Sequence, residues 1–72
     1  MTKDRFALEE VLRALDNAGA LTTGAIAQRL GLTELDVRIL MRSAEANRLV
    51  YSTRAGEWAI TERGRLHTQS RQ

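Results

Sequence analysis

The chain has 72 residues, a length that supports one small hydrophobic core and therefore a single domain over residues 1–72. It has no cysteine, which excludes disulfides and thiolate metal sites, and its apolar runs are far shorter than the roughly 18 residues of a membrane span. The net charge is only +2, but residues 20–72 carry eight arginines against five acidic residues, a net of +3, and ten of the eleven basic residues are arginine.

The first predicted element is a helix over residues 4–18. Apolar residues recur at helical spacing on one face, and Asn17-Ala18-Gly19 marks its end. Phe6 extends the apolar surface toward the N-terminal end and is a candidate for a dimer contact. The residues expected in the core are Leu8, Val11, Leu12 and Leu15.

A second helix is predicted over residues 23–30, after a short extended segment at Ala20-Leu21. The hydroxyl of Thr22 or Thr23 can accept a hydrogen bond from a free N–H at the start of this helix. Gly31 favours the positive φ that ends a helix. The residues expected to point inward are Ile26, Ala27 and Leu30.

A third helix is predicted from Thr33 to about Asn47, and Thr33-Glu34-Leu35-Asp36 is a start similar to a capping box. One face of this helix is apolar and is expected to pack on the first two helices. That face consists of Val37, Leu40, Met41 and Ala44. The opposite face mixes apolar and charged side chains: Leu35, Ile39, Arg42 and Ala46, with Arg38 beside them and Glu34 and Asp36 at the flanks.

A hairpin is predicted next, because residues 49–53 and 58–61 are rich in strand-forming side chains and Arg54-Ala55-Gly56-Glu57 separates them. Alternation places Trp58 and Ile60 on one face, toward the core, with Val50 on the facing strand.

A short capped helix from Thr61 to about Gln69 is predicted to end the domain, with residues 68–72 as a frayed tail. The predicted fold class is therefore mainly α with a small β-hairpin: a three-helix core, a two-stranded wing and a short C-terminal helix.

The order of these elements resembles the winged helix-turn-helix domains of transcriptional regulators such as the MarR, ArsR and DtxR families. The matching segments are residues 21–22, 26–33, 49–50 and 58–64, the last with the pattern aromatic-x-aliphatic-Thr-x-x-Gly. The resemblance implies binding of double-stranded DNA, with the third helix in the major groove and residues 49–61 as a wing on the backbone. Two features depart from the family: Arg48 stands where a glycine usually follows the third helix, and the short wing carries one arginine, Arg54.

The candidate DNA contacts lie on and around the third helix. Arg38 and Arg42 are one turn apart, and each guanidinium can donate two parallel hydrogen bonds to guanine or bind a backbone phosphate. Thr33 and the start of the helix can hold a phosphate oxygen. Further backbone contacts are expected from Arg63 or Arg65. The full candidate set is Thr33, Glu34, Leu35, Arg38, Ile39, Arg42, Arg29 and Arg54.

The same face of the third helix leaves an alternative open. Leu35 and Ile39 form an apolar stripe that suits a thymine methyl group or a protein partner. Glu34 and Asp36 oppose phosphate, although acids in a first turn also stabilise a helix through its dipole. The alternative function is therefore a winged-helix protein–protein interaction module that uses the Leu35/Ile39 face.

An enzyme is not expected. The single histidine, His67, has no nucleophile or carboxylate placed beside it by any spacing, and Glu9-Glu10 is typical of a solvated helix face. No residues at metal-ligand spacing and no glycine-rich phosphate loop occur, so no cofactor, metal or small-molecule ligand is predicted. Packing in the core or wing is the expected role of Trp58.

The expected partners are double-stranded DNA and either a second copy of the chain or another protein, with no membrane. The N-terminus leads into an amphipathic helix and not into the apolar run of a signal peptide. A soluble protein of the cytoplasm is therefore expected, associated with the nucleoid if it binds DNA.

Overall fold

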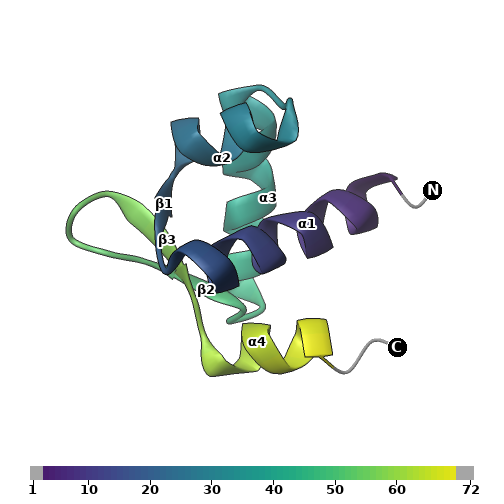
Figure 1. The fold of residues 1–72 in the computed structure, drawn as a ribbon, viewed down its shortest axis with the longest axis vertical. Helices are drawn as coiled ribbons and strands as arrows, with labels where there is room; N and C mark the ends of the chain where they lie inside the picture. Colours follow the sequence, from purple (N-terminus) through teal and green to yellow (C-terminus); the bar gives the residue numbers. More distant parts are fainter. Residues whose placement is uncertain (1–2, 70–72) are drawn as a thin grey trace.

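The elements of the fold follow the predicted order along the chain. The computed structural model describes the backbone of residues 3–69 and the side chains of residues 7–69. Its elements are α1 (Lys3–Ala18), β1 (Leu21–Thr22), α2 (Thr23–Leu30), α3 (Glu34–Ala46), β2 (Val50–Ser52), β3 (Glu57–Ile60) and α4 (Glu62–Gln69). Within residues 3–69 this is a mainly helical fold with four helices and a small antiparallel sheet, from which the β2–β3 hairpin projects (Figure 1).

Two threonines cap the helices that frame the α2–α3 turn. The Oγ1 of Thr22 accepts a hydrogen bond from the Ala25 N–H (3.1 Å), and the Oγ1 of Thr33 accepts one from the Asp36 N–H (3.1 Å). Gly31 ends α2 with a φ of 69°. Both predicted helix starts and the predicted glycine stop are confirmed, with Thr22 rather than Thr23 as the cap of α2.

The sheet has three strands in the order β1-β3-β2: the predicted hairpin is confirmed as β2 and β3, and β1 adds a third strand that was not predicted. Leu21 pairs with Trp58 on one edge of β3, and Val50 pairs with Ile60 on the other. The segment at Leu21-Thr22 was expected only to be extended. Two residues carry no alternation pattern, and their strand identity depends on the free edge of β3, which is distant in sequence.

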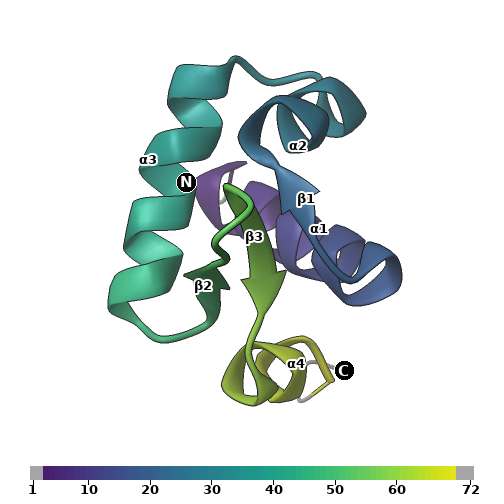
Figure 2. The ribbon, with the colours of Figure 1, turned by 90° about the vertical axis from the view of Figure 1, so that its left-hand side faces the viewer.

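The core lies between the first three helices and the sheet (Figure 2). The predicted inward faces of α1, α2 and α3 are confirmed, with Leu8, Leu30 and Leu40 half-buried at its margin. Burying one large aliphatic side chain contributes roughly 1.5–3 kcal/mol, so this core fixes which face of each helix remains exposed. The fully buried apolar side chains are Val11, Leu12, Leu15, Ile26, Val37, Met41 and Ala44.

Trp58 joins the sheet to α2. Its ring is half-buried against the core, and its Nε1–H donates to the Oγ1 of Thr23 (3.1 Å). The predicted packing role of Trp58 is therefore confirmed. Ala59, its neighbour on the opposite face of β3, is also buried, so both faces of this strand are covered here and strict alternation fails.

The end of α3, the end of β3 and the start of α4 meet at one junction. The Thr61 Oγ1–H donates to the Arg48 carbonyl (2.6 Å), the Thr61 N–H donates to the Leu49 carbonyl (2.9 Å), and the Gly64 N–H donates to the Thr61 Oγ1 (3.0 Å). Gly64 is buried there, and a Cβ at this position would overlap the Leu49 carbonyl oxygen. The Thr-x-x-Gly motif thus caps α4 and seats it against the end of α3.

The C-terminal part of the described chain is ordered helix. Thr68 and Gln69, expected in a frayed tail, are the last residues of α4, and the Thr68 Oγ1–H donates to the Arg65 carbonyl (2.8 Å). The rest of that predicted tail, residues 70–72, and the side chain of Phe6, the predicted dimer contact, lie outside what the structure describes.

Candidate functional site

The exposed face of α3 presents four of the predicted site residues together. Because Val37, Met41 and Ala44 are buried, the opposite side of the helix is turned to solvent. Leu35 is 63% exposed and Ile39 is 60% exposed, which is high for large apolar side chains. The other two residues of this group, both exposed, are Arg38 and Arg42.

The arginines of this face are free to bind an external group. Arg38 and Arg42 make no ion pair or hydrogen bond through their side chains within residues 7–69, and the same holds for Arg29 and Arg54. A guanidinium without an internal partner keeps all five N–H donors for a ligand. The face therefore combines two unpaired cations with an apolar stripe.

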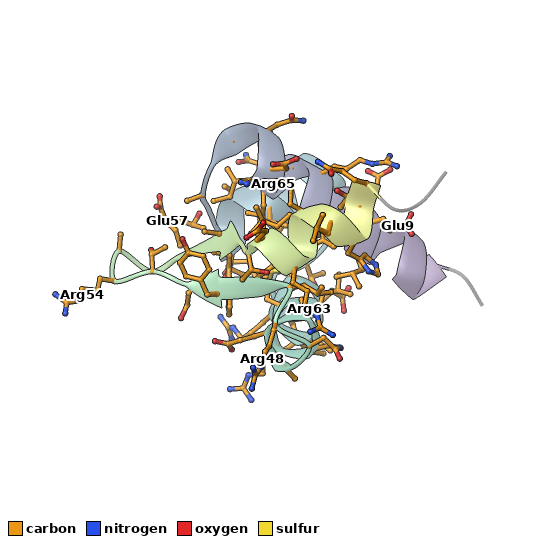
Figure 3. All side chains as sticks on the ribbon, turned by 90° about the horizontal axis from the view of Figure 1, so that it is seen from below. Glu9, Arg48, Arg54, Glu57, Arg63 and Arg65 are labelled. Carbon is orange, nitrogen blue, oxygen red and sulfur yellow. The ribbon has the colours of Figure 1, made fainter. Side chains whose placement is uncertain are left out.

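The remaining predicted residues lie outside this face of α3, at the α2–α3 turn and in the hairpin. Thr33 is the cap of α3 and Arg29 lies in the last turn of α2, so both flank the α2–α3 turn. Arg54 lies apart from them at the tip of the β2–β3 hairpin, as Figure 3 shows. The structure thus groups the α3 residues on one surface and leaves Arg54 as a separate outlying cation.

The hairpin tip is a short, well-defined turn. The Gly56 N–H donates to the Thr53 carbonyl (3.1 Å), the Thr53 N–H donates to the Glu57 carbonyl (2.8 Å), and Gly56 has a φ of 81°. This is the pattern of a three-residue hairpin loop whose last residue is left-handed, a position that suits glycine. Arg54 is therefore held at the outermost point of the hairpin.

Glu34 lies over the start of α2. Its Oε2 is 3.2 Å from the position that a Cβ would take on Gly24. Gly24 belongs to the first turn of α2, where the helix dipole attracts a carboxylate. The charge of Glu34 is thus partly offset by α2, which weakens its opposition to an anion near α3.

Arg65, one of the two arginines predicted to contact the DNA backbone after the wing, forms an ion pair within the protein. Its Nε lies 2.9 Å from Oδ1 of Asp16 in an ion pair that joins α4 to α1. Its guanidinium is therefore engaged within the protein, whereas Arg63 makes no such contact among the described side chains. Of Arg63 and Arg65, the two arginines predicted to contact the DNA backbone, only Arg63 is unpaired among the described side chains.

Arg48 is a candidate site residue that was not predicted from the sequence. Arg48 and Arg63 line a shallow surface hollow, together with Ala46 and Asn47. In the sequence, Arg48 is only a departure from the winged-helix pattern, which usually has a glycine at this position. The proximity of Arg63 depends on the docking of α4, which no local pattern encodes.

Two further classes of site are absent from the described part of the chain. Residues 3–69, whose side chains are described from residue 7 on, contain no group of three or more histidine, aspartate or glutamate side chains arranged to hold a metal ion. None of the helices in that range has both the length and the apolar content needed to cross a lipid bilayer. Comparison with protein-family models, with curated proteins and with solved structures finds no match to this chain.

Proposed function

We propose that the chain is a winged helix-turn-helix protein that binds double-stranded DNA, with α3 in the major groove and the β2–β3 hairpin as the wing. The proposed role is that of a small transcriptional regulator in the cytoplasm. The order of elements supports this proposal: α2, a tight turn through Gly31, α3, and then the hairpin. The observation that carries it is the pair Arg38 and Arg42, exposed and unpaired among the described side chains on one face of α3.

The dimensions of α3 support groove binding. A helix of 13 residues is about 20 Å long, and the major groove of B-DNA, about 12 Å wide, admits an α-helix. In this arrangement Arg38 and Arg42 bind guanine edges or phosphates, Ile39 and Leu35 meet thymine methyl groups, and Arg54 binds a phosphate from the wing.

The size of the molecule supports binding as a pair. The fold measures 29 × 28 × 21 Å, which is less than the roughly 34 Å of one turn of B-DNA. One copy therefore covers about one half-site. We propose that two copies bind adjacent half-sites one helical turn apart.

The test is titration of a labelled mixed-sequence duplex into the protein at several salt concentrations, followed by fluorescence anisotropy. The wild-type protein should lose affinity steeply with salt, because each phosphate contact contributes about 0.9 to the slope of log K against log salt. Arg38→Ala/Arg42→Ala should abolish binding or reduce the slope by about 1.8, while circular dichroism remains unchanged. Arg13→Ala removes one exposed arginine from α1, controls for the loss of a positive charge away from α3, and should bind as the wild type does. Equal affinity and slope in the double variant would remove α3 as the DNA reader.

A second candidate function rests on the apolar part of the same face. The exposure of Leu35 and Ile39 favours a protein partner, since adjacent apolar side chains on a surface are typical of interaction sites. If the wild type binds no duplex at low salt and Leu35→Asp dissociates an oligomer seen by size-exclusion chromatography, the protein-interaction module replaces the DNA reader. An unchanged elution volume for Leu35→Asp would remove a self-association role.

A further inference from the structure

The junction of α3 and α4 holds two arginines whose side chains are unpaired within the described part of the chain. Arg48 and Arg63 line the same shallow hollow, and both are exposed. Figure 3 shows them close to each other at the end of α3, on the side away from the hairpin tip. Neither forms a side-chain hydrogen bond or ion pair within residues 7–69.

The backbone of Arg48 makes an arginine unexpected there. Its φ is 62°, and within the described residues it is the one non-glycine position with positive φ. The Arg48 N–H donates to the Glu45 carbonyl (2.9 Å) and the Leu49 N–H donates to the Ala44 carbonyl (2.9 Å). This paired pattern closes a helix through a left-handed residue, which is most often glycine because a Cβ is strained in that conformation.

The backbone therefore gives no reason for an arginine at position 48. Glycine would form the same two N–H bonds without the strain, so the difference between the two residues lies in the side chain. Since the guanidinium of Arg48 has no partner among the described side chains, its contribution must come from a group outside them. A left-handed non-glycine residue is a recognised sign of strain held for function.

The surroundings of the hollow suit an anion in spite of the nearby helix end. Free carbonyls at a helix C-terminus repel anions. Here the Ser43 carbonyl accepts hydrogen bonds from the Asn47 N–H (3.2 Å) and the Asn47 Nδ2–H (3.0 Å), and the Arg48 carbonyl accepts one from Thr61 (2.6 Å). With the Ala44 and Glu45 carbonyls also bonded, two guanidinium groups face a helix end whose acceptors are largely occupied.

We infer that Arg48 and Arg63 form a phosphate-binding site at the α3–α4 junction. A planar guanidinium donates two parallel hydrogen bonds to phosphate oxygens. Two guanidinium groups can therefore bind one phosphate group from two sides. The source of the phosphate is the backbone of the duplex, and in this respect the inference rests on the proposed function. The site adds a contact with the DNA backbone at the C-terminal end of α3, whereas Thr33 lies at the N-terminal end.

Two single variants and a control test the site. Arg48→Gly relieves the backbone and removes the cation, so its melting temperature should rise by about 4–8 °C while its DNA salt slope falls by about 0.9. Arg63→Gln should lower the slope by a similar amount without raising the melting temperature. Arg13→Gln is the control for loss of one positive charge and should keep the wild-type slope.

A titration of inorganic phosphate separates this site from the proposed function. In the wild type, phosphate should shift the NMR signals of the Arg48 and Arg63 Nε–H groups in a saturable way, and Arg48→Gly/Arg63→Gln should show no saturable phosphate response in the neighbouring backbone amides.

If the wild type binds no duplex but phosphate shifts both signals, the DNA function fails and the phosphate site stands. If both variants keep the wild-type DNA slope, or if phosphate shifts neither signal, the site is refuted. A lower melting temperature in Arg48→Gly refutes the argument from backbone strain.

Discussion

Gly64→Ala is expected to loosen the attachment of α4 to the rest of the fold. An alanine Cβ would overlap the Leu49 carbonyl oxygen and would lie 2.8 Å from Cγ1 of Ile60. The Leu49 carbonyl belongs to the backbone, and Ile60 is buried, so neither neighbour can move aside alone. The start of α4 must therefore shift away from the end of α3.

The size of the effect follows from what this shift breaks. The Thr61 N–H···Leu49 bond and the Thr61 Oγ1–H···Arg48 bond both cross the junction, and each contributes about 0.5–1.5 kcal/mol net. Replacing a helical glycine by alanine returns about 1 kcal/mol. With overpacking of about 1–3 kcal/mol, the net loss is about 1–5 kcal/mol, and its midpoint of about 3 kcal/mol corresponds to roughly 12–24 °C in melting temperature.

Thermal unfolding followed by far-UV circular dichroism measures the loss, with Gly24→Ala as the matched control. Gly24 is also helical, but its added Cβ meets only the end of the Glu34 side chain at 3.2 Å, which can rotate away. Gly24→Ala should therefore leave stability unchanged or raise it by about 0.5–1 kcal/mol. Faster amide exchange at Thr61 and Gly64 in the Gly64→Ala protein would locate the damage at the junction. A melting temperature for Gly64→Ala equal to or above that of the wild type would refute the argument from close approach.

Two further substitutions test hydrogen bonds that define the helix pair and the sheet. Thr33→Ala removes the acceptor for the Asp36 N–H and should lower the free energy of unfolding in urea by about 1 kcal/mol. Thr33→Ser keeps the hydroxyl and should retain most of this stability. Equal losses in the two variants would rule out a capping role. Trp58→Phe and Thr23→Val together form a double-mutant cycle for the Nε1–H···Oγ1 hydrogen bond. We expect a coupling free energy of about 0.5–1.5 kcal/mol. A coupling near zero would show that the bond does not stabilise the fold.

Much of the helical part of the fold could be predicted because its signals are local. The threonine hydroxyls at Thr22 and Thr33 lie three residues from the N–H groups that they accept from, and Gly31 ends α2 within the same segment. The inward faces followed from helical periodicity alone. The third strand, Leu21–Thr22, could not be predicted, because its partner is β3 and its own two residues carry no period.

The candidate site divides in the same way. The exposed face of α3 followed from the buried face of the same helix, so the grouping of Leu35, Arg38, Ile39 and Arg42 needed only local geometry. The engagement of Arg65 with Asp16 and the proximity of Arg48 to Arg63 both depend on where α4 docks. Docking of that kind is set by tertiary contacts such as the Gly64 approach to Leu49, which no spacing along the chain reveals.

The position of β3 between β1 and β2 has a consequence for how the chain assembles. The strand that closes the sheet on β1 comes late in the sequence, and the hydrogen bond from Trp58 to Thr23 spans 35 positions. Contacts of such separation require a large loop to close before they stabilise anything. A nascent chain that has emerged only as far as α3 has a helical layer without the strand that completes it. β1 in the N-terminal half has no strand partner until β3 is made, whereas β3 already pairs with β2 from its own half.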